Sequence, residues 1–139
     1  MLSKTIDYWL FRCYKKILSN TLSNQATVLM FHRVKFGQKT SFDEYIDADE
    51  FRLKMKLLKK YFNVISLPSL ISSMKANELP PMSVVVTIDD GYEDGYSIIT
   101  PILDELNIKG AFFIATEGID RGGLWNDRVS DSIMNTDIK

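Results

Sequence analysis

The sequence predicts a single α/β domain built on a parallel sheet of about four strands with helices between them. Short apolar stretches rich in β-branched residues alternate with amphipathic ones, an order typical of parallel α/β proteins. The stretch 83–88 (SVVVTI) is almost continuously apolar, as expected for a strand covered on both faces. A closed (β/α) barrel typically needs about 250 residues. With 139 residues, the chain is therefore expected to form an open sheet or an incomplete barrel.

The composition describes an ordinary globular protein. Hydrophobic residues make up 45% of the chain and charged residues 25%, which argues against disorder. The net charge of −1 gives no electrostatic basis for a nucleic-acid partner. The single cysteine, Cys13, excludes an internal disulfide and a cysteine-rich zinc site.

Residues 1–22 are expected to form an amphipathic helix that precedes a domain of residues 23–139. Packing of this helix against the domain is favoured, and weak contact with an anionic membrane surface is the alternative. Charged residues interrupt the apolar stretch, so neither a secretory signal nor a membrane span of about 18–20 residues is predicted. The localisation is left open. The apolar residues at helical spacing are Ile6, Trp9, Leu10, Cys13, Ile17 and Leu18.

The first predicted strand contains the apolar run 28–31, which is expected to be buried, and a polar loop follows over 35–47. The stretch 47–62 is predicted to be a helix, because Asp47 and Glu50 have capping-box spacing. Its expected buried face is formed by Phe51, Met55, Leu58 and Phe62.

A short strand over 63–66 and a short helix over 67–77, entered through Pro68, lead to the strand 83–88. Thr100 and Pro101 are predicted to be the N-cap and first residue of the next helix.

The remainder of the chain is predicted to begin with a fourth buried strand, 111–115 (AFFIA). A long loop with three glycines is expected over 116–127, and the tail 128–139 is expected to begin one more helix.

Asp89 and Asp90 stand directly after the strand 83–88 and directly before Gly91. Ligands of parallel α/β folds bind beyond the carboxyl ends of the strands, so a site is geometrically expected here. Two adjacent carboxylates repel each other and are costly to bury unpaired. They therefore lie in a solvated turn or serve a chemical purpose.

This acidic turn allows four interpretations. A solvated turn is the simplest, since Asp and Gly are ordinary turn residues. A calcium loop fails, because Tyr92 and Pro101 occupy positions where ligands are needed. Phosphoryl transfer at a strand-end aspartate lacks a glycine-rich phosphate loop. Metal-assisted hydrolysis would use one carboxylate as a ligand and its neighbour as a base.

The segment 84–120 (VVVTIDDGYEDGYSIITPILDELNIKGAFFIATEGID) resembles polysaccharide deacetylases, also called the NodB-homology or carbohydrate esterase family 4 enzymes. The family's hallmark is a strand ending in Thr-Phe-Asp-Asp-Gly, a helix with PIL and a strand similar to ATFF. Upstream, 28–34 (VLMFHRV) resembles the LMYHRV strand of one branch. The similarity extends from about Val28 to Asp127.

This resemblance implies an incomplete (β/α) barrel of the polysaccharide deacetylase type. It implies hydrolysis of N-acetyl groups on the amino sugars of a polysaccharide substrate. Asp89 matches the family's general base and Asp90 its metal-binding aspartate, with zinc as the implied metal and cobalt or nickel as alternatives. Ile88 replaces the usual Phe.

The chain departs from the family in its histidines. The family completes its metal site with two histidines of a later His-[Ser/Thr]-x-x-His motif, whereas this sequence has one histidine, His32. His32 matches a branch residue that is not a metal ligand, and is expected to pack in the strand or to line the pocket. Trp125 is expected to stack on a sugar or to cover the rim. Glu93 and Asp94 are expected on a solvated face.

We therefore expect a truncated, weakly active or inactive deacetylase. An incomplete barrel would expose apolar edges and favour self-association. The alternative is a non-enzymatic α/β domain that binds a glycan or a protein. Family members usually act on envelope or extracellular polymers.

Overall fold

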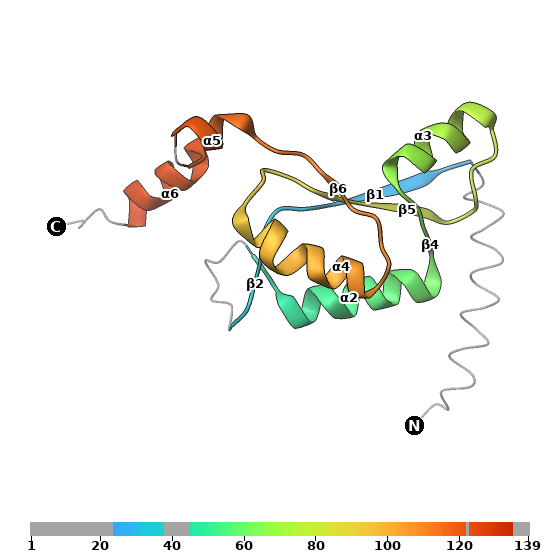
Figure 1. The fold of residues 1–139 in the computed structure, drawn as a ribbon, viewed down its shortest axis with the longest axis horizontal. Coiled ribbons are helices and arrows are strands. Elements are labelled where there is room, and N and C mark those ends of the chain that lie inside the picture. Colours follow the sequence, from blue (N-terminus) through green and yellow to red (C-terminus); the bar gives the residue numbers. More distant parts are fainter. Residues whose placement is uncertain (1–23, 38–44, 122, 135–139) are drawn as a thin grey trace, which may run out of the picture.

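The structure, a computed structural model, describes residues 24–37, 45–121 and 123–134 (Figure 1). Its centre is a four-stranded sheet in which every pairing is parallel. The predicted α/β fold with about four parallel strands is confirmed. The helix expected over 1–22 lies outside the described residues. The strands of this sheet are β1 (Ala26–Phe31), β4 (Asn63–Val64), β5 (Ser83–Ile88) and β6 (Ala111–Phe112).

Strand β5 is the central strand of the sheet. β1 pairs with its whole length, from Ala26 opposite Ser83 to Phe31 opposite Ile88. On the other edge of β5, β4 pairs with its beginning and β6 with its end. All six residues of β5 are consequently buried, including the polar Ser83. This explains the continuous apolar pattern of the strand.

Helices cover both faces of the sheet. Figure 1 shows α3 on one side, and α2 and α4 on the other. The bounds of these helices are Ala48–Tyr61 for α2, Leu67–Ala76 for α3 and Thr100–Glu105 for α4. The larger core cluster lies on the α2 and α4 side and consists of Val34, Ala48, Phe51, Met55, Val86, Ile88, Ile99, Ile102, Leu103 and Ile108.

The start of α2 agrees with the sequence prediction. The side chain of Asp47 accepts hydrogen bonds from the backbone N–H groups of Asp49 and Glu50, which satisfies two donors that the first helical turn leaves free. Phe51 is fully buried, and its ring meets that of Phe31 edge to face at 5.1 Å between centroids. Helix α2 is thus fixed to β1.

Helix α3 also begins as predicted. Ser66 caps it, Pro68 lies in its first turn, and Asn77 ends it in the left-handed conformation with φ of 57°. The polar loop expected over 35–47 is partly wrong. Two short strands, β2 (Val34–Lys35) and β3 (Ile46–Asp47), pair there in parallel.

The prediction that the strand over 28–31 is buried is wrong for one of its faces. Val28 pairs with Val85 and Met30 with Thr87, so both lie on the α3 side of the sheet. Val28 is 52% exposed and Met30 59% exposed. Within β1, Ala26 is the one residue that packs against the smaller cluster on this side. Helix α3 therefore covers the beginning of the sheet and leaves the rest of edge strand β1 open.

Thr100 is not an N-cap, contrary to the prediction. The chain is already helical from Glu93, and a π-helical segment, η1 (Gly95–Ile99), runs directly into α4. The hydroxyl of Thr100 donates to the carbonyl of Gly95 at 2.8 Å. Pro101 has no N–H with which to continue the α pattern, which suits a wider turn just before it.

The last predictions need two corrections. The fourth strand is shorter than 111–115, and Phe113 and Ile114 are half exposed. The predicted loop over 116–127 contains a helix, α5 (Thr116–Arg121), and the predicted tail helix starts earlier, as α6 (Trp125–Met134). Gly118 is one of the three glycines that predict the loop. It lies inside α5, where a Cβ would meet Leu124 at 3.0 Å.

Among the described residues, no helix combines the length and apolar character that a bilayer crossing requires.

Candidate active site at the end of strand β5

The acidic turn begins where β5 ends. The backbone N–H of Asp89 donates to the carbonyl of Phe31 at 2.8 Å, which continues the β1–β5 pairing by one bond. Asp90 and Gly91 then have φ of 72° and 79°, so the chain turns sharply. Both carboxylates are thereby placed at the carboxyl end of the central strand, as the sequence predicted.

Gly91 is needed for this turn on two grounds. Its φ is unfavourable for residues with a side chain, and a Cβ would stand 2.8 Å from Cγ2 of Ile114. The backbone N–H of Ala115 donates to the carbonyl of Asp90 at 3.2 Å. The segment after β6 therefore packs closely on the acidic turn.

A cavity of about 310 Å³ lies beside Asp90. The turn, the segment after β6, and residues of α5 and α6 form its walls, with an apolar lining from Ile114, Ile119 and Leu124 among others. Asp90, Glu93 and Asp127 contribute three carboxylates to the lining.

Asp89 is not part of this lining, but its Oδ1 is buried and has no hydrogen-bond partner among the described residues. Such an atom is costly in a folded protein.

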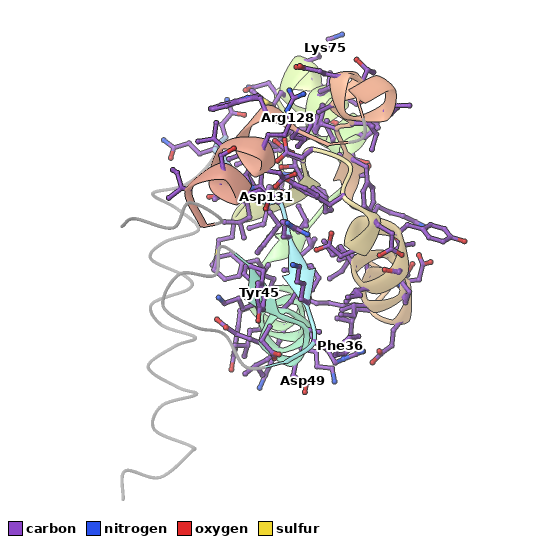
Figure 2. The ribbon with its side chains drawn as sticks, turned by 90° about the vertical axis from the view of Figure 1, so that its left-hand side faces the viewer. Phe36, Tyr45, Asp49, Lys75, Arg128 and Asp131 are labelled. Carbon is purple, nitrogen blue, oxygen red and sulfur yellow. The ribbon has the colours of Figure 1, made fainter. Side chains whose placement is uncertain are left out.

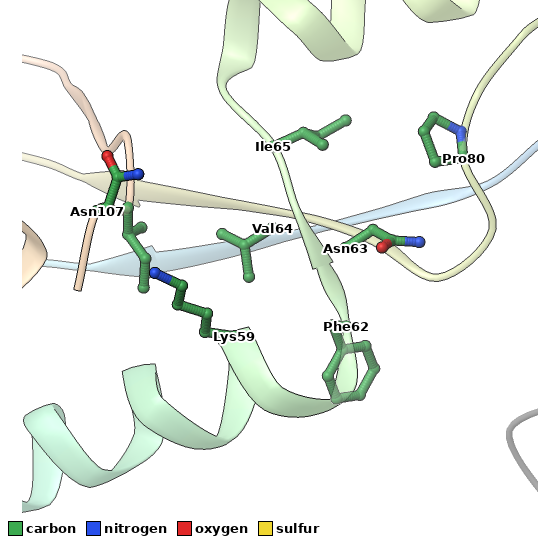
Figure 3. A pocket seen from close by; sticks show the side chains of 8 residues that line it. Lys59, Phe62, Asn63, Val64, Ile65, Pro80 and Asn107 are labelled. Carbon is green, nitrogen blue, oxygen red and sulfur yellow. The ribbon is translucent and has the colours of Figure 1, made fainter. Parts of the chain in front are cut away.

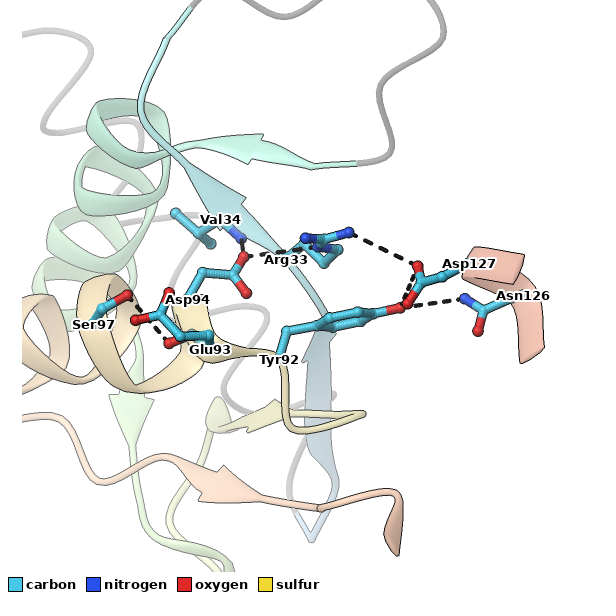
Figure 4. Close-up of polar contacts among 8 residues, drawn as sticks. All are labelled: Arg33, Val34, Tyr92, Glu93, Asp94, Ser97, Asn126 and Asp127. Atoms are coloured by element: carbon cyan, nitrogen blue, oxygen red, sulfur yellow. Dashed lines mark hydrogen bonds and ion pairs between the residues drawn. The ribbon is translucent and has the colours of Figure 1, made fainter. Parts of the chain in front are cut away.

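Asp94 links the acidic turn to the segment after β1. It is 6% exposed, and its Oδ2 accepts a hydrogen bond of 2.8 Å from the backbone N–H of Val34 (Figure 4). Nε of Arg33 lies 4.0 Å from the same oxygen. The expectation that Asp94 lies on a solvated face is therefore wrong. The local pattern at a helix start gave no sign of a partner that lies 60 positions away.

Tyr92 links the same turn to α6. Its hydroxyl donates to Oδ1 of Asp127 at 3.0 Å and lies 3.4 Å from Nδ2 of Asn126. The guanidinium of Arg33 stands over the Tyr92 ring at 4.2 Å from its centroid, and its Nη1 lies 3.9 Å from Oδ1 of Asp127. Figure 4 shows the phenol and the guanidinium converging on Asp127.

The pKa of the Tyr92 phenol is raised above its usual value. Burial is the main cause, and the hydrogen bond from Asn126 acts in the opposite direction. The hydrogen bond to Asp127 and the negative charges of Asp127 and Asp90 raise the pKa further. The phenol therefore stays protonated near neutral pH and can keep donating to Asp127.

His32 and Trp125 are not among the residues that form the walls of this cavity. His32 is exposed just after β1, and Trp125 is 65% exposed at the start of α6. Neither is among the residues that line the cavity next to Asp90. Their roles as pocket-lining residues stay predictions.

The described residues supply only part of a metal site. Within ranges 24–37, 45–121 and 123–134, no three His, Cys, Asp or Glu side chains gather as metal ligands would. Zinc sites use at least three protein ligands, usually with a histidine or cysteine among them. Asp89 and Asp90 alone therefore do not fit a complete zinc centre.

A second cavity of about 310 Å³ lies at the opposite end of the sheet (Figure 3). Two of its polar side chains have partners within the chain: Nζ of Lys59 donates to the carbonyl of Leu106, and Nδ2 of Asn63 donates to that of Pro81. No acidic residue lines it. The acidic turn is therefore the better candidate for chemistry.

Comparison with known proteins supports the assignment of family and fold. A family model of polysaccharide deacetylases matches residues 76–134. No curated protein sequence matches the chain significantly.

Several solved structures are similar to this chain, which spans about half of their length or less. The de-N-acetylase of Aggregatibacter actinomycetemcomitans is 29% identical with a TM-score of 0.62, over 69% of this chain and 39% of that one. IcaB of Ammonifex degensii is 25% identical with a TM-score of 0.55, over 64% and 37%. Streptococcus pyogenes deacetylase PplD, solved with acetate, is 21% identical with a TM-score of 0.61, over 76% and 50%.

The match to the family model includes the acidic turn, and the structural matches cover much of the parallel α/β unit. The predicted resemblance is thus confirmed: residues 76–134 match the polysaccharide deacetylase model, and the partial, barrel-like α/β fold is similar to that of solved deacetylases.

Proposed function

We propose that the acidic turn is part of the catalytic site of a metal-dependent polysaccharide N-deacetylase, with Asp89 as general base and Asp90 as a metal ligand. The observation that carries this proposal is the buried, unpaired Oδ1 of Asp89 at the carboxyl end of the central strand. A desolvated carboxylate oxygen without a partner costs free energy, and such groups concentrate at functional sites.

The reaction would be hydrolysis of an acetamide on an amino sugar. Asp89 accepts a proton from a water molecule while the oxygen of that water adds to the carbonyl carbon of the acetamide. The carbon–nitrogen bond then breaks. The nitrogen leaves as an amine after taking up a proton, and acetate is the other product. Asp90 would be one ligand of a divalent cation, and such a cation would supply Lewis-acid chemistry.

We further propose that the 139-residue chain alone is weakly active or inactive. The sequence contains one histidine, His32, which is not among the residues that line the cavity. Asp90 would thus be left without the additional ligands that a tight zinc site requires.

Calorimetric titration with Zn²⁺, Co²⁺ or Ni²⁺, together with an assay for acetate release from chitin oligosaccharides and peptidoglycan, tests both parts. We expect weak metal binding that is lost in Asp90→Asn and retained in Asp104→Asn, a matched exposed carboxylate on α4. We expect acetate release close to background, with any residual rate lost in Asp89→Asn. Tight stoichiometric binding that survives Asp90→Ala would contradict the assignment of the ligand. Acetate release at ordinary enzymatic rates would contradict the proposed inactivity.

Self-association is a further proposal, supported by the exposed Val28 and Met30 on edge strand β1. Membrane-surface contact through residues 1–22 concerns a segment outside the described residues and stays a prediction.

A further inference from the structure

We propose that Arg33 is a positioning residue that holds α6 against the acidic turn and so shapes the cavity beside Asp90. Its importance for deacetylation rests on the proposed function, whereas the contact itself rests on geometry alone. Arg33 follows β1, and its guanidinium lies near Asp94, Tyr92 and Asp127. It therefore joins three segments that lie far apart in the sequence.

Helix α6 needs such an attachment, because three apolar side chains in it are exposed. Trp125, Val129 and Ile133 are each at least half exposed. Figure 1 shows α5 and α6 at one end of the molecule, beyond the sheet. In Figure 2, Arg128 and Asp131 mark α6 well away from Asp49 at the start of α2. An isolated helix of 10 residues is marginal in water, so α6 depends on its contacts for order.

The contacts that connect the first turn of α6 to the acidic turn are polar. Asp127 accepts from the Tyr92 hydroxyl, and Asn126 approaches the same oxygen. Among the ion pairs of the described residues, the other one that involves α6 joins the exposed Arg128 to Glu117 of α5 at 3.7 Å. Exposed ion pairs of that kind contribute little to the free energy of folding. Asp127 is therefore a point at which α6 is attached to the acidic turn.

The charge of Arg33 makes this approach favourable. Its distances to Asp94 and Asp127, 4.0 Å and 3.9 Å, are too long for hydrogen bonds, so the attraction is mainly coulombic. Without that charge, the buried Asp94 would lose its nearest cation. Asp127 would also approach a region that already contains Asp90 and Glu93. The position of the guanidinium over the Tyr92 ring also helps aim the phenol at Asp127.

Hydrogen exchange of α6 in Arg33→Gln tests this role. We expect amide exchange in residues 125–134 to accelerate about tenfold, while exchange in α2 stays unchanged. A second readout is the fluorescence anisotropy of Trp125 in a Trp9→Phe background, which leaves Trp125 as the single tryptophan. Its anisotropy should fall when α6 detaches.

Three further variants distinguish the attachment of α6 by Arg33 from a general loss of stability. Arg33→Lys keeps the charge but not the guanidinium group, and should retain part of the protection that Arg33→Gln loses. Arg52→Gln removes an ion pair with Glu105, away from α6, and should leave α6 exchange unchanged. Asp127→Asn should reproduce the effect of Arg33→Gln, and the double variant should show less than the sum of the two effects.

Unchanged α6 exchange in both Arg33→Gln and Asp127→Asn would overturn the proposal. If Arg33→Gln accelerates exchange everywhere or does not fold, Asp127→Asn decides. If Asp127→Asn loses protection from hydrogen exchange in α6 alone, the proposed role of Arg33 is supported. Unchanged protection of α6 refutes it. These readouts use neither metal nor acetate, so failure of the proposed function would leave them intact.

Discussion

The two faces of the sheet differ in how completely they are covered. On the face under α2 and α4, Phe51 and Met55 are fully buried in a cluster of ten buried residues. On the face under α3, the buried cluster contains only Leu70, Leu79 and Val85, and the same face of β1 is open to solvent. Burial of apolar surface is the main stabilising contribution to folding. Stability should therefore come chiefly from the first face, and the second face offers an apolar surface for association.

The strongest test of this difference is Phe51→Ala on the well-covered face. Phe51 fills a fully buried position against the ring of Phe31, so truncation should leave a cavity and lower the free energy of unfolding by about 3–5 kcal/mol. Urea denaturation followed by circular dichroism measures the loss. A change below about 1 kcal/mol would mean that this face is not the main core.

Leu70→Ala probes the other face with a smaller expected effect. Leu70 is buried in the small cluster below α3, and its neighbourhood can relax toward solvent more easily. We expect a loss of about 2 kcal/mol in the same denaturation experiment, at the lower end for such truncations. A loss equal to that of Phe51→Ala would show that the two faces contribute equally.

The double variant Val28→Thr/Met30→Gln should change stability least. Both side chains are already half exposed, so the free energy of unfolding should shift by less than about 0.5 kcal/mol. Self-association should fall, because the variant removes apolar surface from an edge strand. Sedimentation velocity over a range of concentrations measures this. Unaltered association would place the contact surface elsewhere.

The parts of the fold that follow local rules were predictable from the sequence. Strand β5 was recognised because burial on both faces gives a continuous apolar run, and α2 because Asp47 caps it. The exposure of Val28 was not predictable, since the apolar pattern of an edge strand does not say which helix covers it. Thr100 and Pro101 are residues typical of a helix start. They do not start a helix here, because the chain is already helical before them.

The candidate site divides in the same way. Asp89, Asp90 and Gly91 are adjacent in the sequence, so their placement at a strand end could be predicted. Arg33 and Asp127 meet the turn only through the tertiary fold, across separations of tens of residues. No short motif encodes such a meeting. Helix α5 was not predicted, because its glycine indicated a loop. Gly118 instead leaves space for the side chain of Leu124, a tertiary contact that the local sequence does not reveal.

The π-helical segment η1 affects how side chains before it and after it are directed around the helix axis. A π turn is equivalent to an α-helix with one inserted residue, and one residue corresponds to a rotation of about 100° around the helix axis. Ile102 and Leu103, buried in the core, fix the phase of α4, while Asp94 at the other end of η1 must face Val34. The extra residue lets both ends keep their preferred directions. Inserting or deleting one residue in η1 would therefore rotate Asp94 away from Val34. The acidic turn would be disturbed although none of its own residues had changed.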